Sequence, residues 1–259
     1  MKLLAPESLA RFTRAQAALI HLGLSAMVAA TIIALMLLVW YPSPYFVAAG
    51  GARLLMILIG VDVILGPLLT FIVFDPAKKS LVYDLAVIAM LQVAALIYGI
   101  HVMASARPAF VVYLRGGFDV VSANDVVTEG MAEVALPEFR SVPLTGPRLA
   151  AARVPVDPGL QLRIGMESMA GGPDFSAYPR YYIPYATASR EAAARGKPLA
   201  ALAKVSPENA AAVAKLTGSS GKSVDELVYL LLRARGAPMS IVLDKANGDV
   251  VGVLPLDPG

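Results

Sequence analysis

The sequence has no cysteine, only two histidines and a single tryptophan among its 259 residues. Without cysteine the chain can form no disulfide bond and offers neither a thiolate nucleophile nor a thiol metal ligand. Both histidines, His21 and His101, come before residue 104, so the rest of the chain lacks the residues of a Ser-His-Asp triad, a Cys-His pair or most zinc sites. The sequence therefore indicates no catalytic set, and we expect no metal ion and no cofactor.

Charged residues are also scarce: they make up 16% of the chain, against 57% hydrophobic residues. An average soluble domain has about 25% charged residues, so the composition favours a membrane protein. The scarcity is local, because residues 104–259 contain 16 of the 22 Lys and Arg and 15 of the 19 Asp and Glu. The basic residues of the first part flank apolar segments, and we expect no binding to nucleic acid.

Three apolar segments are long enough to cross a membrane, at about 16–40, 54–74 and 85–103. The second has 21 residues, which as a helix reach about 31 Å and match the thickness of a bilayer core. The first follows a polar, basic N-terminus of residues 1–15, where a cleaved signal peptide is the alternative. We favour a retained span, because the uncharged run from Leu22 to Trp40 is long for a signal peptide and two further spans follow.

Asp62 lies near the middle of the second apolar segment and is the strongest single candidate site. Small or helix-bending residues flank it: Gly60, Gly66 and Pro67. An ionisable side chain at that depth costs about 2.5–3.5 kcal/mol to insert, so such residues usually face other helices. We expect Asp62 to contact another helix, with Gln92 and Tyr98 of the third span as candidate partners. The alternative is that Asp62 relays protons or binds a partner's transmembrane segment.

Basic residues in the short loops predict the topology. The N-terminal segment has three of them and the loop between the second and third spans has two, Lys78 and Lys79, whereas the first hairpin has only Arg53. By the positive-inside rule, the N-terminus and the Lys78-Lys79 loop face the cytoplasm. Three spans then place residues 104–259 on the far side, which is the periplasm of a Gram-negative cell.

Residues 104–259 are predicted to form one mixed α+β domain. The expected strands are Ala109–Arg115, Phe118–Val121, Arg148–Val154, Met239–Asp244 and Asp249–Leu254. Gly116-Gly117 indicates a hairpin turn, and Asn247-Gly248 indicates a type I′ turn. The expected helices run from Asp157 to Met169, from Ser206 to Gly218, and over Leu227–Arg235 after the capping-box spacing of Ser223 and Glu226.

Two local patterns invite a functional interpretation. The segment Gly218–Ser223 resembles a phosphate-binding loop, but the first glycine of that motif is missing and a helix precedes it, so we interpret it as a turn between helices. The second pattern is an aromatic cluster with one arginine: Tyr178, Arg180, Tyr181, Tyr182 and Tyr185. It is either a recognition surface or a loop that packs over a sheet, and the sequence leaves both open.

Residues 60–125, which begin with GVDVILGPLLT and include the Lys-Lys loop, resemble the type IV pilin accessory proteins of Gram-negative bacteria, the Tfp-type family. LTGPRLAAARVP, GGPDFSAYPRYYIPYA and the closing Asn-Gly hairpin are also similar to that family. The resemblance implies an inner-membrane protein that assists assembly of its cognate type IV pilin, and it implies no catalytic residues.

The sequence therefore predicts a membrane protein with three transmembrane α-helices (residues 16–103) and a periplasmic α+β domain (residues 104–259). Type IV pilin is its expected partner, beside membrane lipid. Two alternatives remain: a membrane-anchored periplasmic enzyme, and a small ion or proton carrier centred on Asp62.

Overall fold

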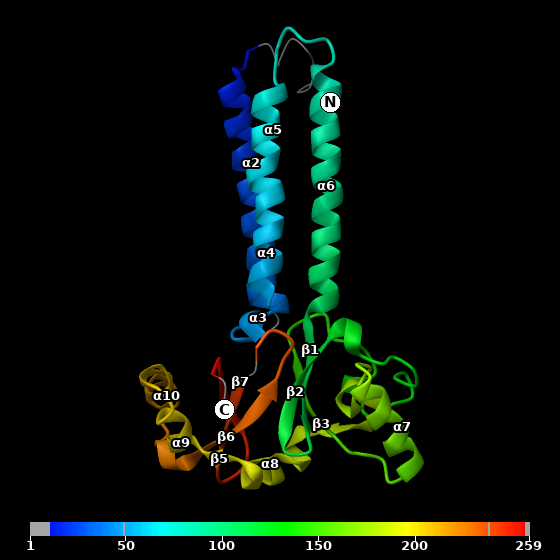
Figure 1. Cartoon of the computed structure of the whole chain (residues 1–259), viewed down its shortest axis with the longest axis vertical. Coiled ribbons are helices and arrows are strands. Elements are labelled where there is room, and N and C mark those ends of the chain that lie inside the picture. The colour runs from blue at the N-terminus through cyan, green and yellow to red at the C-terminus, as the bar shows by residue number, and fades with distance from the viewer. Residues whose placement is uncertain (1–10, 49, 238, 257–259) are drawn as a thin grey trace. The chain divides into compact units, whose positions relative to one another are not determined.

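The computed structural model describes residues 11–48, 50–237 and 239–256 (Figure 1). The chain divides into two compact units. The helical unit comprises Met1–Leu38 and Gly51–Ala104, and the sheet unit comprises Val39–Gly50 and Ser105–Gly259. The segment Val39–Gly50, which joins the first two apolar helices in sequence, thus belongs to the sheet unit.

Three helices are long and apolar enough to cross a membrane: Arg14–Trp40, Leu55–Val73 and Leu81–Ala106. They confirm the three predicted apolar helices. The first is α2 (Arg14–Leu35), which continues as the π-helical segment η2 (Met36–Trp40). The second consists of α4 (Gly51–Ile59), the π-helical segment η3 (Gly60–Leu65) and α5 (Gly66–Val73), and the third is α6 (Leu81–Ala106).

Within the helical unit, α2 packs along α5 and η3 (Figure 1). A polar contact joins the two helices, because Nδ1 of His21 lies 2.6 Å from Oγ1 of Thr70. The third helix, α6, is packed less closely: its buried residues are Leu81, Ile88 and Met103. Most of its apolar surface is therefore free to face lipid or another helix.

The sheet unit is built on one mixed sheet, in the order β4-β3-β1-β2-β6-β7-β8 with β5 beside β6. The strands are β1 (Pro108–Leu114), β2 (Gly117–Ser122), β3 (Arg148–Ala152), β4 (Tyr182–Pro184), β5 (Lys197–Pro198), β6 (Leu227–Arg233), β7 (Met239–Asp244) and β8 (Val250–Leu254). The pairs β1–β3 and β2–β6 are parallel and the others antiparallel. The predicted α+β class is confirmed.

Short helices cover the sheet and its ends. The α-helices are α3 (Tyr45–Ala48), α7 (Pro158–Met169), α8 (Ser189–Arg195), α9 (Leu199–Ala203) and α10 (Pro207–Ser220). Single 3-10 turns lie between them: η4 (Ala123–Asp125), η5 (Pro137–Phe139), η6 (Phe175–Ala177), η7 (Pro179–Tyr181), η8 (Tyr185–Thr187) and η9 (Val224–Glu226). Helix α7 begins as predicted, because the Asp157 side chain accepts hydrogen bonds from the Gly159 and Leu160 amides.

Strand β1 is buried along its whole length, so the sheet has a core on each face. Val111 and Tyr113 face one core together with residues of α8, and Tyr45 of α3 packs against it. Phe110 and Val112 face the other core, which the segments around α7 and η6 close. A third cluster joins α9 and α10 to β6 and β7. Alternation along one buried strand thus places aromatic and branched side chains in two separate cores.

The first hairpin is confirmed, with its turn one residue earlier than predicted. Leu114 pairs with Gly117, and Arg115 and Gly116 between them have φ of 52° and 86°. Positive φ at both central residues is the type I′ geometry that suits the twist of the two strands.

The predicted helix over Leu227–Arg235 is wrong, because Leu227–Arg233 form strand β6 and the two residues that follow are irregular. The capping box at Ser223 and Glu226 is present, but it caps only the single 3-10 turn η9. The run LVYLLL is apolar on every side and lies between β2 and β7, where both faces of a strand are buried. Burial in the middle of the sheet therefore outweighs the local helix signal.

Two turns also differ from the sequence prediction. Helix α10 continues past Gly218 to Ser220 and ends at Gly221, whose φ is 68°, so the phosphate-loop-like segment leads from a helix towards a strand. The β7–β8 hairpin is confirmed, but its loop is wider than a type I′ turn. Asp244 Oδ1 accepts hydrogen bonds from the amides of Ala246 and Asn247, and this Asx arrangement stabilises the loop.

Candidate functional site

Asp62 lies in the π-helical segment η3, where its main-chain carbonyl lacks a hydrogen-bond donor from the same helix. The Gly66 amide donates to the Val61 carbonyl, five residues back. In the same register the Asp62 carbonyl would accept from residue 67, which is a proline without an amide hydrogen. Gln92 of α6 supplies the missing donor, since its Nε2 lies 3.1 Å from the Asp62 carbonyl oxygen.

Gly66 gives Gln92 the space for this contact. A Cβ atom at position 66 would lie 2.0 Å from Nε2 of Gln92, so a larger residue would push the amide away. Pro67 is buried beside it. Three residues singled out from the sequence thus act together. Pro67 removes a main-chain donor, Gly66 leaves space for a side chain, and Gln92 supplies the hydrogen bond instead. Gly60 takes no part, because a Cβ atom added there would have no other atom of the described chain within 4 Å.

The carboxyl group of Asp62 has no such partner. The residue is 6% exposed, and neither carboxyl oxygen has a hydrogen-bond partner among the residues that the structure describes. Asp62 lines a cavity of about 360 Å³. The other described residues that line it are Ile57, Val61, Ala95, Tyr98, Gly99, Val102 and Met103. We call this space the Asp62 cavity. The structure therefore brings Asp62, Gln92 and Tyr98 to one region, but Gln92 binds the main chain and leaves the carboxyl group free.

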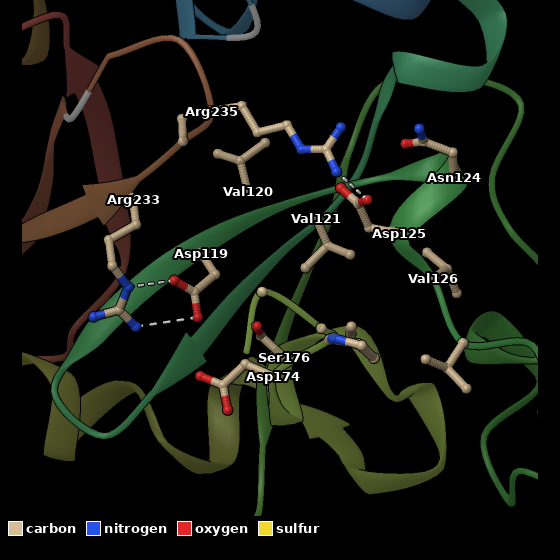
Figure 2. Close-up of a pocket in the computed structure, with 16 residues that line it drawn as sticks. Asp119, Val120, Val121, Asn124, Asp125, Val126, Asp174, Ser176, Arg233 and Arg235 are labelled. Atoms are coloured by element: carbon tan, nitrogen blue, oxygen red, sulfur yellow. Dashed lines mark hydrogen bonds and ion pairs between the residues drawn. The ribbon is translucent and has the colours of Figure 1, made fainter. Parts of the chain in front are cut away.

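A second candidate site lies in the sheet unit (Figure 2). This sheet pocket has a volume of about 610 Å³ and is lined by β2, the turn η4, the segment 171–177 and residues 233–235. Two ion pairs lie among the residues that line it. Arg233 holds Asp119 through two hydrogen bonds, with Nε at 2.5 Å and Nη2 at 3.1 Å from the carboxylate oxygens, and Arg235 holds Asp125.

The charged groups of the sheet pocket are mostly bound to one another. Its two guanidinium groups are already paired, and the Asp119 carboxylate raises the pKa of Arg233. Asp174, also at the pocket, uses one carboxyl oxygen to accept a hydrogen bond from the Phe175 amide. No cluster of three His, Cys, Asp or Glu side chains that could hold a metal ion exists in the described parts of the chain.

The sequence did not single out the pocket residues Asp119, Asp125, Arg233 and Arg235. Each pair is separated by more than a hundred residues, and only the parallel pairing of β2 with β6 brings them together. The closely spaced Arg233 and Arg235 at the end of an apolar run were the one available signal. The partners of those arginines depend on tertiary structure.

The tyrosine cluster lies mostly inside the sheet unit. Tyr178, Tyr182 and Tyr185 are buried, with 4–7% exposure. The Tyr182 hydroxyl donates to the Ser176 carbonyl and the Tyr185 hydroxyl to the Gly248 carbonyl, and burial raises the pKa of both hydroxyls, so each stays protonated as a donor. These three rings therefore serve the core.

The exposed part of this cluster is Arg180, whose guanidinium carbon lies 5.2 Å from the Tyr178 ring centre and 5.5 Å from that of Tyr181. Tyr181 is half-buried beside it. This stacked pair is what the cluster presents at the surface. The two loop lysines, Lys78 and Lys79, are exposed, and Lys78 forms an ion pair with Asp84 at 2.6 Å.

The fold places the chain in the class of proteins that combine apolar helices long enough to span a bilayer with a mixed-sheet domain, which here contains a polar pocket. Comparison with known proteins identifies the family. The family described as "Fimbrial assembly protein FimB" matches residues 11–50. The fimbrial assembly proteins of Dichelobacter nodosus serogroups I and E1 are each 31% identical to the chain over 242 residues, covering 92% of this chain and 93% of the relative.

A third relative, the fimbrial assembly protein of serogroups C1 and C2 of the same organism, is 37% identical over 116 residues, which cover 44% of this chain and 88% of the relative. No solved structure matches the chain significantly. The chain belongs to the family of fimbrial assembly proteins. The resemblance to the accessory proteins of type IV pili is thereby confirmed.

Proposed function

We propose that this protein is a non-catalytic accessory factor of the bacterial inner membrane that assists assembly or stability of its cognate type IV pilin. The observation that carries the proposal is the similarity to the fimbrial assembly proteins over nearly the full length of both chains. A role in pilus assembly follows from membership of the family. The finer assignment, to the pilin subunit itself, rests on the resemblance of residues 60–125 to pilin accessory proteins.

The architecture supports this proposal. A pilin held in the membrane has an apolar helix and a globular head, and a protein with spans and a folded domain of its own has a surface for each. In the helical unit the candidate contact is Asp62, and in the sheet unit the candidates are the sheet pocket and the exposed Arg180–Tyr181 pair. A non-catalytic role is supported by the chemistry of the sheet pocket, whose arginines and aspartates bind one another.

Deletion of the gene tests the proposed function. We expect surface piliation and twitching motility to fall strongly, and unrelated protein secretion to continue as before. Complementation with the full chain should restore both properties. Piliation at the wild-type level in a strain without related genes would refute the accessory role.

The proposed topology gives a second prediction. Lys78 and Lys79 are exposed in the loop between the second and third apolar helices, and basic loops stay on the cytoplasmic side. Alkaline phosphatase, which is active only outside the cytoplasm, should therefore be active when fused after the last residue and inactive when fused after Lys79. The Lys78→Glu, Lys79→Glu double variant should weaken this difference, and the opposite pattern in the parent protein would overturn the proposed orientation.

A further inference from the structure

We propose that the Asp62 cavity binds a membrane-spanning helix of a different protein, one that presents a hydrogen-bond donor to the Asp62 carboxyl group. This inference rests on the proposed function, which gives the pilus subunit as the partner, and it deepens that function by locating the contact. It also states the chemistry of the contact: an amine, amide or guanidinium group on an otherwise apolar helix.

The first argument is the free carboxyl group. Asp62 is more than nine-tenths buried, lines the cavity, and has no hydrogen-bond partner for either oxygen in the described chain. An unpaired polar group in an apolar environment costs several kcal/mol, and more when it is ionised. Gln92 is held at the main-chain carbonyl by the Pro67 and Gly66 arrangement. Tyr98 also lines the cavity, but its hydroxyl forms no hydrogen bond with the Asp62 carboxyl group. The carboxyl group is therefore available to an incoming donor.

The second argument is the shape of the cavity wall. Ala95 and Gly99 of α6 are four residues apart and both line the cavity, which is the small-xxx-small spacing that lets a second helix backbone approach closely. Ile57 and Tyr98 at the same cavity are 60% and 69% exposed, so the cavity is open at the side of the helices and not only at their ends. A partner within the membrane can enter it without unfolding the helical unit.

The third argument identifies the source of the donor. Asp62 lies inside the span Leu55–Val73, about 10 Å from one end and about 16 Å from the other at the helix rise per residue, so the headgroup of a lipid does not reach it. A second copy of this chain offers no lysine or arginine in its apolar segments, and its Gln92 amide is already bound to a main-chain carbonyl. A different protein that crosses the membrane remains the occupant that satisfies the carboxyl group.

The test is site-specific photocrosslinking of the full chain in the native cell. A benzoylphenylalanine residue replaces Tyr98, which lines the cavity, or Met90, which is 63% exposed on the same helix but outside the cavity. We expect an adduct from position 98 and much less from position 90. Mass spectrometry should place the adduct in the transmembrane segment of another pilus protein. Equal adducts at both positions, an adduct with lipid alone, or an adduct with a second copy of this chain would overturn the proposal.

Two variants of Asp62 test the chemistry in the same assay. Asp62→Leu removes every acceptor and should reduce the adduct at position 98 by roughly threefold to tenfold, the range of a hydrogen bond between membrane helices. Asp62→Asn retains an acceptor and should stay within about twofold of the parent. Adduct yield is compared at equal protein level, so a loss through poor folding is seen separately. An Asn variant as weak as the Leu variant would contradict recognition by hydrogen bonding. If deletion abolishes piliation while position 98 gives no adduct, the proposed function stands and this inference fails.

Discussion

Replacing Gly248 by alanine is expected to destabilise the sheet unit strongly. Gly248 lies in the β7–β8 loop with a φ of 79°, and a Cβ atom there would lie 1.9 Å from the Ser189 carbonyl oxygen. The overlap is with backbone, so it cannot be relieved by rotating a side chain. The Gly248 carbonyl also accepts the Tyr185 hydroxyl at 2.6 Å, and any shift of the loop would weaken that hydrogen bond.

The expected cost of Gly248→Ala combines two effects. A positive φ costs about 1–2 kcal/mol for a residue with a side chain, and forcing an atom into packed space costs about 1–3 kcal/mol. A total of about 3 kcal/mol should lower the melting temperature of a domain of this size by roughly 6–12 °C. Thermal unfolding of a fragment with residues 105–259, followed by circular dichroism, measures the change.

Gly218→Ala is the matched control for this experiment. Gly218 is inside α10, and no other described atom lies within 4 Å of its Cβ position. Alanine favours a helix over glycine by about 1 kcal/mol, so this variant should unfold at the same or a higher temperature. If both variants melted alike, the close approach of the β7–β8 loop to Ser189 would be refuted.

The second large effect is expected for Gly66→Ala, in the helical unit. The new methyl group would displace the Gln92 amide, and the Asp62 carbonyl would lose its donor. A hydrogen bond between membrane helices is worth about 1–2 kcal/mol in model peptides, and we expect a loss of that size. Gln92→Ala removes the same hydrogen bond from the other side and should cost a similar amount.

The double variant distinguishes this explanation from a general packing defect. With alanine at position 92 there is no amide to displace, so adding Gly66→Ala should cost nothing more and should gain a little helix propensity. The measurement is unfolding of the purified full chain in mixed micelles with increasing denaturing detergent. Two costs that simply add would show that Gly66 and Gln92 act independently and would contradict the role assigned to the Asp62 carbonyl.

Contacts between segments that are distant in the sequence explain where the structure differs from the sequence-based predictions. The run Leu227–Arg233 follows a genuine capping box and still forms a strand, because β2 and β7 bury both of its faces. The sequence left open whether the tyrosines near residue 180 face solvent or the core, and in the structure three of them are buried. Neither outcome can be read from residues that are neighbours in the chain, since each depends on contacts with distant strands.

The sequence by itself determined the three apolar helices, the central position of Asp62, the lack of cysteine and histidine after residue 101, and the hairpins at both ends of the sheet unit. These features follow from hydrophobic length, residue type and turn chemistry, which are local properties. Only the tertiary structure decided that Gln92 binds the Asp62 carbonyl and not its carboxyl group, and that two Asp–Arg pairs line one pocket. The physical reason is that a hydrogen bond depends on the positions of two atoms within a few tenths of an ångström, and those positions are set by how whole helices and strands pack.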